Sequence, residues 1–547
     1  MALTLGANAI GKLYLGSTQI NKAYLGATVL FSSGFDPASL FAGGIAGAWY
    51  GPSDLSTLFQ DSAGTTPVTT AGQPVGLMLD KSKGLGPELV TNGKFETNLD
   101  GWSVVAPCIM ARVGSTLESS RNGGGFNNQA ATEIAMVAGK TYIFSADLTT
   151  LSDSNGALVL FGAGRTPERS PVAAWRIPTP GKITAVYTAT VTETAFLVAG
   201  ISGSSSGTAG FDNISVRELP GNHASQPTAA ARPTYQVTPS RLTIDKVDDR
   251  LSVTVPVGGF TGTMVLGTDQ GTASYGVNIP AGPYDIGGRG GRYFPGNAIV
   301  GQLIRDGALS AGDAAATEAY FVENGATASY GAVTDFESYW RDWSEITSFP
   351  LIDTSAGTNF SFAWQDCTSL TSFPLIDTSS GTNFRGAWRD CSSLTSFPLI
   401  DTSSGTGFGR AWQDCTSLTS FPLIDTSSGN IFAIAWLRCS SLTSFPLIDT
   451  SSGTSFALAW RDCTSLTSFP ANAFDNIKGG DFSSAFNNTA LTQTSIDNIL
   501  VSLVASGIAA GTRVFDQSGG SAPSAAGEAA IDTLRSRGWT VAVTGGY

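Results

Sequence analysis

The chain has 547 residues, of which 42% are hydrophobic and only 13% charged, and it contains 65 glycines and 25 prolines. This composition favours short strands and tight turns over helical bundles, and the length allows about three to four domains. The formal net charge of −13 excludes the basic surface that attracts nucleic acids or anionic membranes. The single histidine, His223, leaves little material for imidazole-based zinc sites or catalytic relays.

Five of the six cysteines recur at intervals of 24 residues, so they occupy one position of a repeat. Equivalent positions of stacked coils lie about 4.8 Å apart and point in parallel, which suits a disulfide poorly. We therefore expect buried free thiols that behave as small hydrophobic groups. The residues are Cys367, Cys391, Cys415, Cys439 and Cys463.

The sequence offers no obvious route into or across a membrane. The longest apolar stretch, 499–511, is interrupted by Ser and Gly and is too short to span a bilayer. The first residues lack the basic region and continuous apolar core of a signal peptide. A surface-type composition without an export signal is expected of a virion component that assembles in the cytoplasm and is released by lysis.

Residues 1–32 contain a ten-residue echo, in which IGKLYLG from Ile10 is followed by INKAYLG from Ile20. Each unit predicts a short strand closed by a glycine turn. About thirty residues cannot bury a core alone, so we expect contact with a partner or with other copies of the chain, as in a trimer. The segment resembles the N-terminal attachment segments of tailed-phage fibre and spike proteins, which implies attachment to other virion proteins. A meander packed on the next domain is the alternative.

Residues 33–87 include WYGPSDLSTLFQD, which begins at Trp49. This run resembles a connector that is widespread in phage fibre proteins, where Asp usually stands in place of Gly51. The resemblance predicts a connector and says nothing about chemistry.

Residues 88–219 alternate as a β-sandwich does, and they open with NGKFE and close with FDNISV. These ends resemble jelly-roll carbohydrate-binding modules. The resemblance implies a structural Ca²⁺ shared by Glu96 and Asp212, since hard oxygen ligands suit calcium. A sandwich edge held by hydrogen bonds without metal is the alternative. Trp102 and Trp175 are candidate sugar platforms, although a tryptophan in such a sandwich is commonly part of the core.

A linker rich in Pro, Ala and Ser is expected over 220–239, followed by a second small β-sandwich with a short helix over 240–339. Residues 340–483 repeat every 24 residues, which predicts a solenoid. Its unit, with a Cys, then Leu and later an Ala-aromatic pair, resembles BspA-like leucine-rich repeats. Residues 484–547 are expected to form an α/β C-terminal cap, with one helix around Ile496 to Val504, a second from Pro523 to Arg537, and a strand from Trp539.

The near-identical repeats differ mainly around their second Phe and after their Trp, and we expect these varied positions to face outward as a receptor-binding strip. Relaxed packing on a free face is the alternative. The candidate residues are Asn359, Phe362, Gln365, Asn383, Arg385, Arg389, Arg410, Gln413, Ile431, Ile434, Leu437, Leu458 and Arg461. A separate aspartate column, Asp353, Asp377, Asp401, Asp425 and Asp449, is expected either to cap turns or to bind cations.

The sequence thus predicts a mainly β, multidomain phage fibre or spike that binds a host-surface glycan or protein. A head-surface or decoration fibre with weak glycan adhesion is the alternative. A polysaccharide-degrading spike is less favoured, because a glycosidase needs two carboxylates at a defined separation and no local pair suggests one. We therefore expect no enzyme activity and no cofactor beyond structural calcium.

Overall fold

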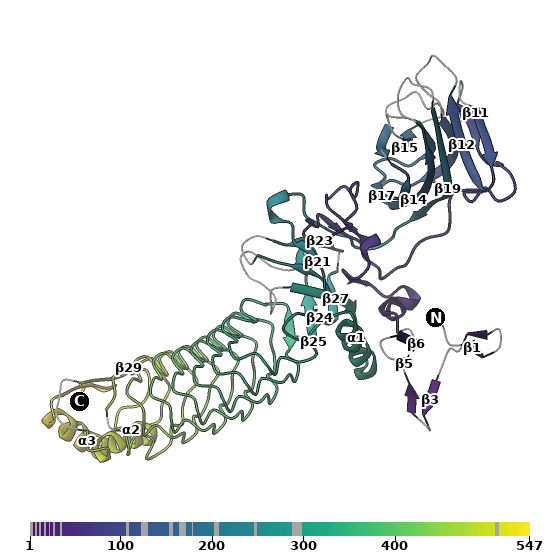
Figure 1. Cartoon of the computed structure of the whole chain (residues 1–547). Coiled ribbons are helices and arrows are strands. Elements are labelled where there is room, and N and C mark those ends of the chain that lie inside the picture. The colour runs from purple at the N-terminus through teal and green to yellow at the C-terminus, as the bar shows by residue number, and fades with distance from the viewer. Residues whose placement is uncertain are drawn as a thin grey trace.

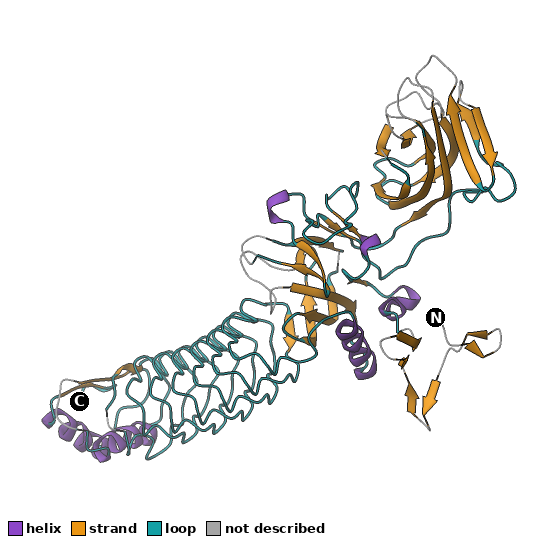
Figure 2. Cartoon of the chain, viewed as in Figure 1, coloured by secondary structure: helices purple, strands orange, loops and turns teal. Residues whose placement is uncertain are grey.

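The computed structural model describes the strands of the first 32 residues and residues 35–547, except 106–108, 122–128, 153–156, 164–170, 178, 202–206, 246–248, 257, 287–297, 478 and 509–512. It is a mainly β protein built of several separate sheets (Figure 1). A sandwich stands at one end, a second β domain lies in the middle, and a long stack of coils runs from it to the C-terminal cap. Within the described ranges, helices occur in the middle and in the cap (Figure 2).

The N-terminal echo folds as short antiparallel hairpins, as its glycine turns predict. The pairs are β1 (Thr4–Leu5) with β2 (Asn8–Ala9), β3 (Leu13–Leu15) with β4 (Thr18–Ile20), and β5 (Lys22–Leu25) with β6 (Thr28–Ser32). Strands of two to five residues are too short to form an independent core. Attachment through this segment stays a prediction.

The first sandwich consists of two five-stranded antiparallel sheets, ordered β10-β13-β18-β15-β16 and β11-β12-β19-β14-β17. Alternate residues of β14 are buried, as a strand with one face on a core requires. The strands are β10 (Ser103–Val105), β11 (Ile109–Val113), β12 (Thr116–Arg121), β13 (Gln129–Met136), β14 (Thr141–Leu151), β15 (Ala157–Ala163), β16 (Pro171–Ile177), β17 (Gly181–Thr188), β18 (Glu193–Ile201) and β19 (Gly207–Glu218).

The second β domain is discontinuous in sequence, and this corrects the expectation of a connector over 33–87. Strand β7 (Gly47–Tyr50) pairs with β27 (Ala298–Asp306), while β8 (Leu58–Phe59) and β9 (Leu77–Met78) join a sheet with β20 (Ala224–Ser225), β23 (Leu251–Val255) and β26 (Gly282–Ile286). The apolar residues of the WYGPSDLSTLFQD run, Trp49, Tyr50, Leu58 and Phe59, are buried in this domain. The first sandwich is therefore inserted between β9 and β20.

The linker expected over 220–239 is also packed structure, because β20 and β21 (Thr234–Val237) both pair with neighbouring strands. The second sheet is completed by β22 (Ser240–Thr243), β24 (Phe260–Thr268), β25 (Thr272–Ile279) and β28 (Ile346–Ser348). Short helical segments cover this domain. They are η1 (Pro37–Gly44), η2 (Leu55–Thr57), η3 (Ala229–Ala231) and α1 (Ala311–Glu323), the last within the predicted helical region.

The lone histidine holds together the two chain segments that lead into and out of the inserted sandwich. The backbone N–H of Asp80 donates to His223 Nδ1 at 3.1 Å, so Nε2 carries the proton and donates to the Leu219 carbonyl at 3.0 Å. The Asp80 carboxylate in turn accepts the N–H of Asn222 at 2.8 Å. His223 is therefore structural.

The repeats stack as coils joined by parallel bridges between equivalent residues, from Asp335↔Asn359 to Ser455↔Asp481. The Trp rings of successive coils stack nearly parallel, with Trp340 and Trp364 centroids 5.3 Å apart. The five cysteines are buried free thiols, as predicted, and each donates to a Trp carbonyl of the preceding coil, as Cys367 does to Trp340 at 3.1 Å. Pairing of β28 with β25 and a hydrogen bond from Trp340 to Tyr275 join the stack to the second domain.

The C-terminal cap has the predicted α/β form. A three-stranded parallel sheet of β29 (Phe482–Phe486), β30 (Arg513–Gln517) and β31 (Trp539–Ala542) extends the last coil. Helix α3 (Ala525–Ser536) packs against β31, and α2 (Gln493–Ala505) packs against α3 and hydrogen-bonds to the last coil, both close to the predicted bounds. None of the helices in the described ranges combines the length and apolar character needed to cross a bilayer.

Candidate binding surface

The varied positions around the second Phe of each coil lie in register along the stack, and we call them the varied band; Ser361, Gly386 and Gly409 within it are buried. Its first column, Asn359, Asn383, Gly407, Ile431 and Ser455, follows the parallel bridges directly. The amides form a ladder, since Asn383 Nδ2 donates to Asn359 Oδ1 at 3.1 Å and Asn359 Nδ2 to Asp335 Oδ1 at 3.0 Å. Two coils further on, Ile431 is 47% exposed. The first column therefore carries paired amides at its start and a single exposed isoleucine before Ser455.

A second column of the band has a left-handed backbone in every coil. The φ angles of Phe362, Gly386, Arg410, Ile434 and Leu458 lie between 56° and 65°. Such angles are rare outside glycine and are outliers for a β-branched residue. The left-handed conformation costs an L-residue about 1–2 kcal/mol, whereas most other left-handed positions of the stack hold Asp or Asn, which tolerate it. The bulky side chains of this column are therefore retained against the preference of the backbone.

Phe362 is the aromatic centre of the band. The guanidinium carbons of Arg385 and Arg341 lie 5.6 and 5.9 Å from the centre of its ring. Arg385 is exposed, and the ring itself is half-buried. At these distances the cations interact with the aromatic face. The start of the band thus carries an aromatic ring with two cationic neighbours.

The column after Trp corrects part of the predicted strip. Gln365 and Gln413 are only 4% and 6% exposed, and each donates to the next aspartate, at 2.9 Å to Asp366 and 2.8 Å to Asp414. The glutamines are buried because a column of partly buried carboxylates lies beneath the surface, and buried carboxylates require hydrogen-bond donors. These glutamines stabilise that column and are not available to a receptor.

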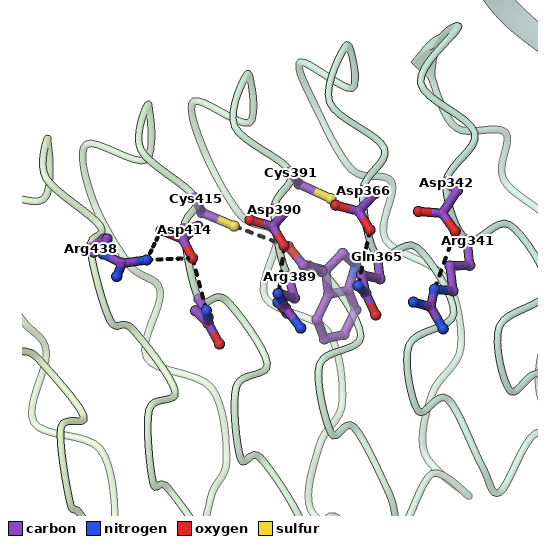
Figure 3. A network of polar contacts seen from close by, with 12 residues as sticks. Arg341, Asp342, Gln365, Asp366, Arg389, Asp390, Cys391, Asp414, Cys415 and Arg438 are labelled. Carbon is purple, nitrogen blue, oxygen red and sulfur yellow. Dashed lines mark hydrogen bonds and ion pairs between the residues drawn. The ribbon is translucent and has the colours of Figure 1, made fainter.

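Arginines serve the same carboxylate column in other coils (Figure 3). Arg389 Nε lies 2.9 Å from Asp390, and Arg438, which replaces the aspartate of its own coil, lies 3.2 Å from Asp414. Burial raises the pKa of Asp390, and the neighbouring Asp366 and Asp414 raise it further against the opposing effect of Arg389. In the same column as Arg389, Leu437 is half-buried, and Arg461 is exposed 3.6 Å from Asp462.

The other aspartate column, from Asp353 to Asp449, caps turns. Each carboxylate accepts the N–H of the serine two residues later, at 2.8–3.1 Å. These hydrogen bonds lower the pKa of Asp353 and Asp425. The sequence left open whether this column caps turns or binds cations, and these hydrogen bonds are those of turn capping.

In the first sandwich, Trp102 is a core residue, which corrects its expected role as a sugar platform. Its side chain is 7% exposed, its Nε1 donates to the Thr91 carbonyl at 3.2 Å, and its ring packs edge-on against Phe95. Trp175 pairs with Val159 in the ladder of β16 and β15. The side chain of Trp175 lies outside the described residues.

The two residues of the predicted calcium pair, Glu96 and Asp212, lie in different environments. Glu96 is exposed, whereas Asp212 stands opposite Asp147 in the ladder of β19 and β14. A different glutamate, Glu88, fastens the end of β19, since it accepts from the N–H of Val216 at 3.0 Å and pairs with Arg217 at 3.2 Å. No group of three or more His, Cys, Asp or Glu side chains suited to a metal occurs in the described part of the chain. The calcium prediction thus rests on the pair alone.

Sequence reasoning missed an exposed leucine column on the stack. Leu351, Leu375, Leu399, Leu423 and Leu447 are between 50% and 75% exposed. Leu370, Phe373 and Ile376 are buried at steps of three residues. Leu375 lies between the buried Phe373 and Ile376, so its side chain has to face outward. The three-residue spacing of the buried positions could therefore have predicted the exposed leucine column from the sequence.

No family model and no curated protein matches the sequence. Several solved structures show a likeness to part of the chain, and three of them have a TM-score of 0.20 each. The first, titled "CBM4 structure and function", is 16% identical and covers 24% of this chain and 99% of its own. The CBM22-1 xylan-binding domain of Paenibacillus barcinonensis Xyn10C is 12% identical, covering 24% and 96%. The CBM22-1–CBM22-2 tandem of the same protein is 9% identical, covering 42% and 94%.

Proposed function

We propose that the protein is a non-enzymatic adhesin, a tailed-phage fibre or spike component that binds a host-surface glycan or protein through the varied band. The observation that carries the proposal is the left-handed column of Phe362, Arg410, Ile434 and Leu458. Residues held in unfavourable backbone conformations cluster at functional sites. Asn or Gly at these positions would lower the strain, so side-chain identity has been favoured over stability.

The composition of the band supports recognition. Arg385 and the half-buried Phe362 lie at one end, and the apolar Ile431 and Ile434 lie towards the other. Aromatic and arginine side chains, together with exposed apolar surface, are enriched where proteins bind partners. The same proposal assigns the coils to the BspA-like leucine-rich-repeat class, the first sandwich to the carbohydrate-binding jelly rolls, and the N-terminal hairpins to virion attachment.

The test is binding of the labelled 547-residue chain to a panel of bacterial cells and to an array of purified O-antigens and capsular polysaccharides. One variant combines Arg385→Ser with Arg410→Ser, and another combines Ile434→Ser with Leu437→Ser. We expect each to lose at least tenfold in binding to the best probe while its melting temperature stays unchanged.

A charge-matched control combines Lys83→Ser with Arg241→Ser, two cations of the second β domain. The control should bind as the unaltered protein does. Folded protein that binds no probe, equal binding by the band variants, or cleavage of a bound polysaccharide would each contradict the proposal.

A further inference from the structure

The exposed leucines form one surface, the leucine face, consisting of Leu351, Leu375, Leu399, Leu423 and Leu447. Each exposes between half and three quarters of its side chain, in register along five successive coils. Since neighbouring coils are joined by parallel bridges, equivalent residues lie about 4.8 Å apart. The leucines therefore form an unbroken apolar stripe, and contiguous exposed apolar surface marks an interaction site in a soluble protein.

A row of threonines, four residues before the leucines in each coil, has its hydroxyl groups occupied within the stack. Thr371, Thr395, Thr419 and Thr443 are exposed, yet each hydroxyl donates to the carbonyl of the equivalent threonine one coil earlier, as Thr371 does to Thr347 at 3.1 Å. The hydroxyl is thus used within the stack, and the methyl group remains for a partner. No Lys or Arg occurs between Cys367 and Ile376, nor in the same segment of the following coils.

The leucine face is invariant where the varied band is not. All five coils carry Pro-Leu-Ile-Asp at this face, whereas the first band column reads Asn, Asn, Gly, Ile and Ser. The repeats have therefore diverged at the band, whereas this exposed apolar column keeps one side chain in every coil and so offers the same contact about every 4.8 Å. An unrelated partner does not present one surface every 4.8 Å, but a second stack of the same chain, parallel and in register, does.

We propose that the leucine face is a self-association surface, on which parallel copies of the chain pack in register, coil against equivalent coil. Leu399 comes 14 residues after Arg385 in a 24-residue coil, which is about half a turn further round. The varied bands therefore remain on the outside of the assembly. Self-association through the leucine face requires no receptor.

The aspartate column beside the leucine face is compatible with this packing. Asp377 and its equivalents are two residues beyond the leucines, and their carboxylates accept from serines of their own turns. They remain exposed and charged at the rim of the contact. Repulsion between copies at the rim is screened by salt, so association should strengthen as ionic strength rises.

Cross-linking between single introduced cysteines tests both the surface and the register. The five repeat cysteines are completely buried, so in a Cys108→Ser background an exposed cysteine can be modified selectively. With a short bis-maleimide, Leu399→Cys should give 399–399 cross-linked dimers in high yield. Arg385→Cys on the varied band should give none. An equal mixture of chains carrying Leu351→Cys or Leu447→Cys should give no mixed product, because parallel packing holds these positions four coils, about 19 Å, apart.

The triple variant Leu375→Ser, Leu399→Ser and Leu423→Ser measures the contribution to assembly. Since these side chains are exposed, replacing them should not destabilise the chain itself. The melting temperature of the variant should therefore not fall below that of the unaltered protein diluted until it is a 56.4 kDa monomer. In sedimentation, the mass of the triple variant should shift towards 56.4 kDa. If the N-terminal hairpins hold the copies together, the mass stays high, and the triple variant should instead lose cross-linking at a cysteine introduced at position 447. Unaltered protein that sediments as a monomer, absence of 399–399 product, or a mixed 351–447 product would overturn the proposal. Loss of self-association with retained cell binding leaves the proposed receptor function intact, so the two can fail separately.

Discussion

The ring of Phe362 lies over Gly386, the equivalent residue of the next coil, so closely that a Cβ on Gly386 would stand 2.6 Å from ring atom Cδ1. Arg385, directly before that glycine, places its guanidinium 5.6 Å from the same ring. Two successive coils thus build one aromatic and cationic feature: one supplies the ring and the next supplies the space and a cation. A band with identical residues in every coil could not do this.

Gly386→Ala should therefore displace the Phe362 ring and strain the backbone, whose φ is +61°. We expect a loss of about 1–2 kcal/mol in the free energy of unfolding, measured by chemical denaturation. The matched control is Gly409→Ala in the next coil. There the added Cβ meets Ile431 Cγ2 at 3.4 Å, an ordinary contact, so the change should be close to zero. Equal effects at both positions would contradict the packing described.

Two aspartates of the stack should respond in opposite directions when replaced by asparagine. The pKa of Asp390 is raised by burial, so its charged form weakens the fold at pH 7, and Asp390→Asn should increase stability. The pKa of Asp425 is lowered by its hydrogen bonds to Ser427, so Asp425→Asn should decrease stability at pH 7. Denaturation midpoints at pH 7 measure both, and effects of the same sign would be inconsistent with these environments.

The pH dependence of the two variants follows from linkage. The stabilising contribution of Asp425 is present above the unfolded pKa, near 3.9, and is lost as the pH falls. Asp390 behaves in the opposite way, because the fold favours its neutral form. The loss of stability that its charged form causes is absent at low pH and grows as the pH rises through its raised pKa. Both differences from the unaltered protein should therefore shrink between pH 6 and about pH 3.

Acidification should weaken the junction at which the first sandwich is inserted. Burial lowers the pKa of His223, and its neutral ring both accepts from Asp80 and donates to Leu219. The stability that it contributes is complete above the unfolded pKa, about 6.5, and falls as the pH decreases below that value. The melting temperature should drop between pH 7 and pH 5.5 in the unaltered protein and less in His223→Gln. Parallel pH profiles would remove His223 from this role.

The cysteines of the stack should be inert in the folded protein. Burial raises the pKa of Cys367, Cys415 and their equivalents far above that of a free thiol, and the thiolate is the reactive form. A chromogenic disulfide reagent should therefore detect at most one thiol per native chain at pH 8, at Cys108, and six after denaturation. Rapid reaction of two or more native thiols would contradict the packing.

The repeat stack was the most predictable part of the fold. Its period of 24 residues places Trp364, Cys367 and Leu370 in one local environment that every coil repeats, so a single unit suffices to define the core. The helices of the cap were recognised from the apolar spacing around Ile496. These features depend on local patterns.

The failures of prediction involve partners distant in sequence. Nothing near Trp49 indicates that β7 pairs with β27, some 250 residues away, so a sheet strand was interpreted as part of a connector. Gln365 varies between coils as a surface residue does, although its amide is committed to a carboxylate column visible only in three dimensions. The left-handed angle of Ile434 has no sequence signal, since a β-branched residue is the last expected there.

The central claim is that the varied band binds a receptor at the expense of stability, and one paired measurement tests it most directly. The variant Ile434→Asn with Leu458→Asn places a residue that tolerates the left-handed backbone at two strained positions. Asn472→Ile, at φ +62° in the last coil, is the inverse control. We predict that the double variant is at least as stable to denaturant as the unaltered protein but binds the best cell or polysaccharide probe at least tenfold more weakly, whereas the control loses stability and keeps binding. Unchanged binding by the stable double variant would contradict the account.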